Sequence, residues 1–129
     1  MQIHESAEDY LEQILVIKKE KGAVRSIDIA NNLGYSKPSV SIAMKNLREN
    51  GYITMDKDNL ISLTDEGMKI ASRIYFRHRT LREFLEKLGV SPENADKDAC
   101  KMEHDMSDEG FQKLSAYLEN VLNKGKTAR

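Results

Sequence analysis

The spacing of hydrophobic residues predicts two helices at the start of the chain. One covers residues 7–20, where apolar side chains recur at intervals of three and four residues and so share one face of a helix. The second is shorter and covers residues 26–33, with Ser26 as its expected N-cap. The apolar stripe of the first helix consists of Leu11, Ile14 and Leu15.

A third helix follows after a tight turn at Gly34-Tyr35. Ser36 is its expected N-cap, and Pro38 is tolerated in the first turn because the missing N–H would have no helical partner there. The helix runs to Asn50, and its core-facing stripe is Val40, Ala43, Met44 and Leu47. Two helices joined by a short turn in this way predict a helix-turn-helix.

The remaining pattern predicts a hairpin and then only helices. Residues 52–55 and 60–63 alternate between apolar and polar side chains, and the turn-forming run Asp-Lys-Asp-Asn lies between them. A long helix follows over about residues 65–88. Two further helices are expected over about 92–105 and 108–123, the last with a long apolar side.

The fold class is therefore mainly α, with two predicted domains. Residues 1–64 form an N-terminal winged helix-turn-helix, and residues 65–129 form a C-terminal helical domain that starts with the long helix. The 129 residues carry a formal net charge of −1, so DNA binding has to be argued from local residues rather than from overall charge. No apolar run is long enough to span a bilayer, the acidic N-terminus does not resemble a signal peptide, and a single cysteine fits a reducing compartment. We expect a cytoplasmic protein with no membrane partner.

The third helix is the expected DNA-reading element. A helix-turn-helix places its second helix in the major groove, with the first residues of that helix near the base edges. Small hydroxyls allow close approach to DNA, an exposed isoleucine can contact a thymine methyl, and lysines contact phosphates. The candidate DNA-binding residues are Ser36, Lys37, Pro38, Ser39, Ser41, Ile42 and Lys45. A winged helix used only for protein contacts is the alternative.

A second candidate site lies in the C-terminal half. Cys100, Glu103 and His104 are spaced at i, i+3 and i+4, so a thiolate, a carboxylate and an imidazole share one helix face. These are ligands of a transition-metal ion. Asp9 and Glu12 on the first helix and His78 on the long helix are candidates to complete the shell. Each residue taken alone also has an ordinary structural role, so the prediction rests on their joint presence.

The chain resembles the diphtheria-toxin-repressor/MntR family of metalloregulators, in the short form without an SH3-like domain. The segments that carry the resemblance are AEDYLEQI, SIDIANNLGYSKPSVSIAMKNL, YFRHRTLREFL and DKDACKMEHDMSDEGFQKL. The resemblance implies a homodimer that takes Mn(II) or Fe(II) as corepressor, binds a palindromic operator in double-stranded DNA and represses metal-uptake genes. It implies no enzymatic activity.

The resemblance also implies a ligand set with features of both branches of the family. Asp9 and Glu12 match first-helix ligands of the manganese branch, whereas Cys100 matches the cysteine of the iron branch. An iron-type ancillary site is not expected, because Arg82 and Asp96 stand at its positions and arginine does not bind a cation. His78, Glu103 and His104 match ligands shared by both branches.

Three other functions remain open at this stage. One is a winged-helix regulator that senses another ligand or another metal such as Zn(II), and titration of metals during DNA binding separates these cases. A catalytic zinc enzyme is disfavoured because the chain lacks an HExxH motif and a nucleophile paired with a base. A redox sensor acting through Cys100 would need an intermolecular partner.

Overall fold

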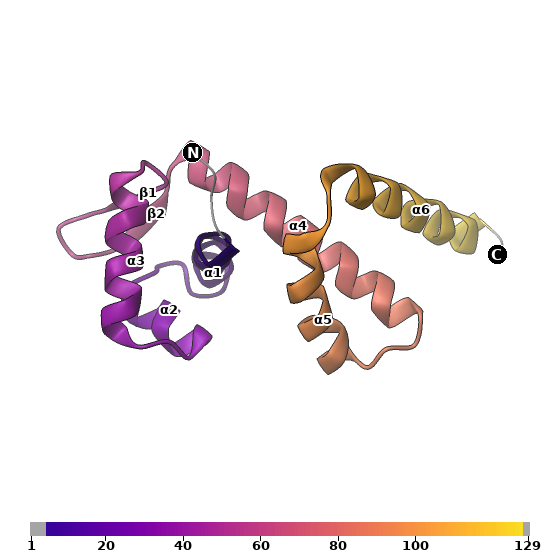
Figure 1. Ribbon diagram of the computed structural model, residues 1–129, viewed down its shortest axis with the longest axis horizontal. Coiled ribbons are helices and arrows are strands. Elements are labelled where there is room, and N and C mark those ends of the chain that lie inside the picture. The colour runs from indigo at the N-terminus through magenta and orange to yellow at the C-terminus, as the bar shows by residue number, and fades with distance from the viewer. Residues whose placement is uncertain (1–4, 128–129) are drawn as a thin grey trace. The chain divides into compact units, whose positions relative to one another are not determined.

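The computed structural model describes residues 5–127, and the chain divides into two compact units (Figure 1). The first unit extends to Tyr75 and the second begins at Phe76. One helix, α4 (Asp65–Lys87), starts in the first unit and continues into the second. None of the helices within the described residues is long and apolar enough to cross a membrane.

The first unit is a winged helix-turn-helix, as the hydrophobic pattern predicts. Besides the start of α4, it contains α1 (Glu5–Lys21), α2 (Ser26–Leu33), α3 (Lys37–Glu49), β1 (Ile53–Met55) and β2 (Ile61–Leu63). The predicted bounds of these elements differ from the observed ones by at most two residues, so the predicted order and element types are confirmed.

A single hydrophobic core joins the helices of the first unit to the hairpin. From α1, Leu11, Ile14 and Ile17 are each at most 1% exposed. They belong to the same buried cluster as Val40 and Met44 of α3. Because burial of such side chains is the main stabilising contribution in a small domain, α1 and α3 are held in one packed body.

The antiparallel hairpin formed by β1 and β2 is the wing. Ile53 pairs with Leu63 and Met55 with Ile61. The wing is tied to the rest of the unit because the N–H of Ile61 donates to the carbonyl of Val24 over 2.8 Å. A Cβ atom at Gly67, in the first turn of α4, would lie 2.0 Å from the carbonyl oxygen of Tyr52, so only glycine fits at this crossing.

The helix caps confirm one prediction and correct another. Ser36 caps α3, since its hydroxyl accepts a hydrogen bond from the backbone N–H of Ser39 over 3.3 Å. The prediction of Ser26 as the cap of α2 is wrong, because Arg25 occupies the N-cap position. There the carboxylate of Asp28 accepts a hydrogen bond from the backbone N–H of Arg25 over 3.0 Å. An acidic residue three positions after the cap therefore satisfies the terminal donor in place of the serine hydroxyl.

The second unit consists of the rest of α4, α5 (Pro92–Asp105) and α6 (Asp108–Thr127). Leu81, Ala99 and Phe111, one from each helix, form its buried core, and Phe76 contacts Phe111 edge to face with ring centroids 5.7 Å apart. Ala99 lies directly before Cys100 on α5. The packing of this core therefore fixes the rotation of the helix that carries the predicted metal ligands.

Candidate metal centre and DNA-reading surface

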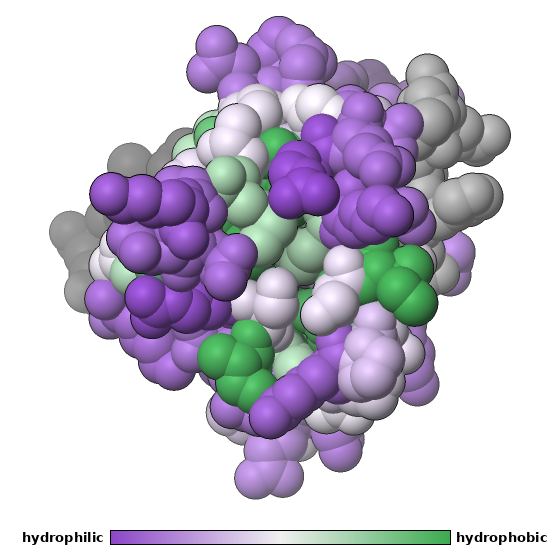
Figure 2. Space-filling view, turned by 90° about the vertical axis from the view of Figure 1, so that its left-hand side faces the viewer, coloured by the Kyte–Doolittle hydropathy of each residue, from purple (hydrophilic) through white to green (hydrophobic). Residues whose placement is uncertain are grey.

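The exposed side of α3 carries the side chains predicted to read DNA. Val40, Met44 and Leu47 are buried on its inner side. All seven candidates are exposed, and Ile42 is 63% exposed. Figure 2 shows the face of the first unit that carries α3 and the wing, where hydrophilic residues predominate and a few hydrophobic side chains lie among them. An exposed helix with this mixture can offer hydroxyls, ammonium groups and one aliphatic side chain to a duplex.

Two of the candidate serines also hold the start of α3 in place. The hydroxyl of Ser36 donates to the hydroxyl of Ser39 over 2.8 Å while accepting from its backbone N–H. Lys37 and Ser41 line a shallow groove together with Ser26 and Ile27 of α2. The first turn of α3 is therefore already ordered in the protein alone, and this lowers the entropic cost of docking it against DNA.

Arg25 and Lys57 are two basic residues that the sequence analysis did not select. The guanidinium of Arg25 donates to the carbonyl of Asp58 over 3.4 Å and so links the start of α2 to the tip of the wing. Lys57 lies in the exposed turn of the wing, whose shape is set by Asp56 accepting from the N–H groups of Asp58 and Leu60. An isolated basic residue at a helix start or in a hairpin turn belongs to no periodic pattern, so neither residue could be selected from the sequence.

Three predicted metal ligands lie together in the second unit. Nδ1 of His78, on α4, is 2.9 Å from Oε2 of Glu103, on α5. Nε2 of His104 is 3.5 Å from the other carboxylate oxygen of Glu103. The Glu103 side chain is 0% exposed and that of His104 is 2% exposed. Two imidazoles around a buried carboxylate are donors suited to a divalent transition-metal ion, so these residues fit the expected ion.

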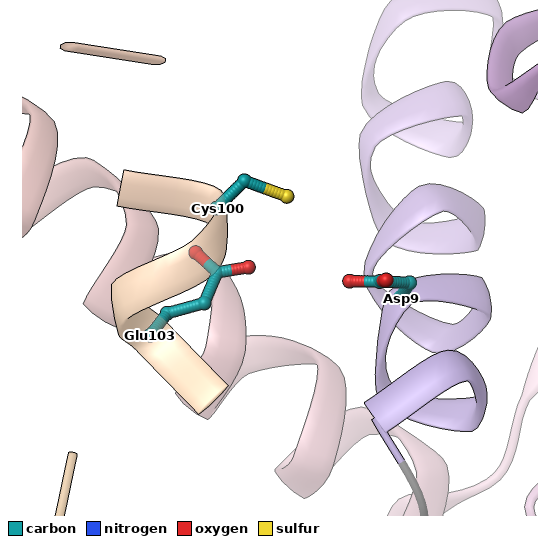
Figure 3. A group of neighbouring side chains, drawn as sticks. All are labelled: Asp9, Cys100 and Glu103. Atoms are coloured by element: carbon teal, nitrogen blue, oxygen red, sulfur yellow. The ribbon is translucent and has the colours of Figure 1, made fainter. Parts of the chain in front are cut away.

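Cys100 extends this donor face by one turn of α5. Figure 3 shows the thiol of Cys100 and the carboxylate of Glu103 projecting from the same side of the helix. Cys100 is exposed, so its sulfur is accessible to a ligand. This arrangement follows from the i, i+3 spacing, which places the two side chains on one face.

Asp9 and Glu12 belong to α1 in the first unit. Asp9 is partly exposed and Glu12 is 7% exposed. Between them, Tyr10 is buried and contacts Tyr35 edge to face, with ring centroids 5.9 Å apart. Burial raises the pKa of the Tyr10 hydroxyl, and Tyr35 and Asp9 raise it further, so Tyr10 stays neutral. The contact connects the acidic segment of α1 to the turn directly before α3.

Arg77 is a buried positioning residue that no pattern in the sequence marks. It is 4% exposed, and its guanidinium donates to the carbonyls of Glu103 and Met106, each over 3.1 Å. It also pairs with the carboxylate of Asp108 and lies over the ring of Phe111. Arg77 therefore holds the end of the ligand-bearing helix α5 against the start of α6.

Comparison with known proteins shows a family relationship over almost the whole chain. Residues 2–60 match the N-terminal DNA-binding domain of iron-dependent repressors, and residues 64–124 match their metal-binding and dimerisation domain. An HTH-type transcriptional regulator of Methanocaldococcus jannaschii is 34% identical over 122 residues, which cover 93% of this chain and 98% of that protein. The transcriptional regulator MntR of Escherichia coli O6:H1 is 42% identical over 115 residues, covering 89% and 74%.

Solved structures agree with this relationship. The structure of the manganese regulator SloR superimposes with a TM-score of 0.78 at 28% identity, covering 92% of this chain and 55% of that one. The chain thus spans about half the length of that solved relative. The two matched domains define a DNA-binding regulator of the metal-dependent class, and the matched relatives are transcriptional regulators and not enzymes. The chain belongs to the iron-dependent repressor family, which includes MntR, and the resemblance noted in the sequence is confirmed.

Proposed function

We propose that this chain is a transcriptional repressor that binds operator DNA when it holds Mn(II) or Fe(II). The observation that carries the proposal is the cluster of His78, Glu103 and His104 in the second unit, on a chain whose first unit presents an exposed helix-turn-helix. In this proposal the DNA-binding and metal-binding domains divide near residue 64, and the matches of residues 2–60 and 64–124 to two family domains support this boundary. The regulated genes are those of metal-ion uptake, and the protein acts in the cytoplasm.

The proposed ligand set is larger than the cluster in the second unit. It adds Cys100 from α5 and the two carboxylates Asp9 and Glu12 from α1. Support comes from the shared helix face of Cys100 and Glu103, from the i, i+3 spacing of Asp9 and Glu12, and from the match of these positions to the family pattern. Hard carboxylate oxygens favour Mn(II), whereas the softer thiolate favours Fe(II), Co(II) or Zn(II).

In this proposal a divalent ion would be held by Asp9, Glu12, His78, Cys100, Glu103 and His104, and it would supply coordination bonds and positive charge. Residues of α1 and α3 lie in one hydrophobic core. Coordination of Asp9 and Glu12 would therefore restrain the recognition helix together with α1. The ion can shift the protein toward its DNA-competent state only by the difference between its binding free energies for that state and for the other states. A coupling of about 1–3 kcal/mol changes DNA affinity roughly 5- to 150-fold.

A homodimer completes the proposal. Two recognition helices must lie about 34–36 Å apart to enter successive major grooves of a palindromic operator. Two side chains on α6, Tyr117 at 64% and Val121 at 43% exposure, are large hydrophobic groups available for pairing. Ser36, Lys37, Pro38, Ser39, Ser41, Ile42 and Lys45 contact the DNA, with Arg25 and Lys57 added as phosphate contacts beside them.

The test is an anaerobic DNA-binding titration. Duplexes are first selected from a random library by the Mn(II)-loaded protein. Their affinity is then measured at matched free concentrations of Mn(II), Fe(II) and Zn(II), with and without chelator. We expect metal to raise the affinity of the wild-type protein and to have no effect on Glu103→Ala, with Glu93→Ala, an exposed acid on the same helix, as the control. Equal DNA affinity of metal-stripped and metal-loaded wild-type protein would refute the proposal.

A further inference from the structure

The ring of His78 is held from both sides by carboxylates of α5. Its Nδ1 faces Glu103, as described above, and its Nε2 is 2.8 Å from Oδ1 of Asp96. Asp96 and Glu103 are seven residues apart, which is about two helical turns, so both project from the same side of α5. The imidazole therefore bridges two carboxylates on one helix.

The two carboxylates lie in different surroundings. The Glu103 side chain is fully buried, whereas that of Asp96 is 53% exposed. Neutral imidazole has one nitrogen that carries a proton and one that offers a lone pair. A histidine that binds a metal commonly donates its other N–H to a carboxylate, which fixes the tautomer and the ring orientation. In this site the buried side of the ring faces a proposed ligand and the exposed side faces Asp96.

Arg82 lies close to the carboxylate of Asp96. Its guanidinium nitrogen Nη1 lies 3.7 Å from Oδ1 of Asp96, the same oxygen that faces His78, and its Nε lies 3.4 Å from Glu86. The positive charge of Arg82 disfavours a metal ion at that oxygen, because like charges repel. It still permits the oxygen to form an ion pair with the guanidinium and to accept a hydrogen bond from the imidazole.

We infer that Asp96 is a positioning residue for the metal centre. It accepts the Nε2–H of His78, so that Nδ1 would offer its lone pair to the ion that Glu103 also binds, and it does not itself bind an ion. The inference rests on the proposed function, since it treats His78 and Glu103 as ligands. It adds a residue that controls metal affinity from outside the ligand set.

The test compares three variants of the full chain: Asp96→Ala, Asp96→Asn and the control Asp98→Ala. Asp98 is an exposed acid on the same helix, so its removal changes the helix charge by the same amount. Mn(II) affinity and stoichiometry are measured by competition with a fluorescent chelator. The protonation pattern of His78 is read from long-range proton–nitrogen spectra of the Zn(II)-loaded protein labelled with ¹⁵N-histidine, together with the exchange rate of the Nε2 proton.

We expect Asp96→Ala to weaken Mn(II) binding about 10- to 100-fold and to speed exchange of the Nε2 proton. Asp96→Asn keeps an acceptor oxygen and should recover most of the affinity, whereas Asp98→Ala should match the wild type. Unchanged affinity and exchange in Asp96→Ala would overturn the inference. So would an equal loss in Asp98→Ala, which would mean an effect of charge alone, or the loss of a whole ion from the stoichiometry, which would make Asp96 a ligand. A wild-type protein that binds neither Mn(II) nor Fe(II) would instead refute the proposed function.

Discussion

The substitution Arg77→Met should lower the free energy of unfolding by an amount that the contacts of Arg77 allow us to estimate. Methionine keeps an unbranched stem but removes the donors to the carbonyls of Glu103 and Met106. Each buried carbonyl left without its hydrogen bond costs about 1–3 kcal/mol. The ion pair with Asp108, whose side chain is 73% exposed, adds at most about 1 kcal/mol because solvent screens it. The two carbonyls and the ion pair together give an expected loss in free energy of unfolding of about 2–7 kcal/mol.

This loss is a large part of the roughly 5–15 kcal/mol that stabilises a typical domain. Urea unfolding followed by far-UV circular dichroism measures it, with metal removed by chelator and protein concentration held constant, because dimerisation shifts apparent stability. Arg82→Met is the matched control: its side chain is 45% exposed and pairs with exposed acids, so the loss should stay below about 1 kcal/mol. A loss for Arg77→Met no greater than that of the control would refute the assignment of Arg77 as the buried link between α5 and α6.

Three further predictions test the wing, the metal preference and the DNA surface. Gly67→Ala should destabilise the protein by about 1–3 kcal/mol in the same urea assay, because the added Cβ would overlap a backbone carbonyl. The control is Gly110→Ala, where the atom nearest to the added Cβ is a serine hydroxyl at 3.2 Å. An equally small change for both variants would contradict this prediction. Cys100→Ser should shift preference toward Mn(II) in metal-competition assays, whereas an equal loss for Mn(II), Fe(II) and Zn(II) would rule out a role in selectivity. Lys45→Ala should weaken DNA binding of all sequences and reduce the slope of log affinity against log salt by about 1, with metal affinity unchanged; a sequence-dependent loss would show that Lys45 reads bases instead.

The sequence by itself determined the elements and their order. Apolar residues at helical spacing, capping residues and a turn-rich run between two alternating segments are local signals, so they predicted the winged helix-turn-helix and the helices after it. The same local spacing placed Cys100, Glu103 and His104 on one face of α5, because side-chain direction along a helix depends only on position. The family relationship was also legible from motifs spread along the chain.

Only the tertiary structure decided which side chains meet across different helices. His78 lies 25 residues before Glu103 in the chain, and their 2.9 Å contact depends on the packing of Leu81 and Ala99 in a shared core. The buried role of Arg77 and the contact of Asp96 with His78 arise in the same way. No period or motif marks such residues, since an arginine on a helix gives the same local signal whether it faces solvent or the carbonyls of a neighbouring helix.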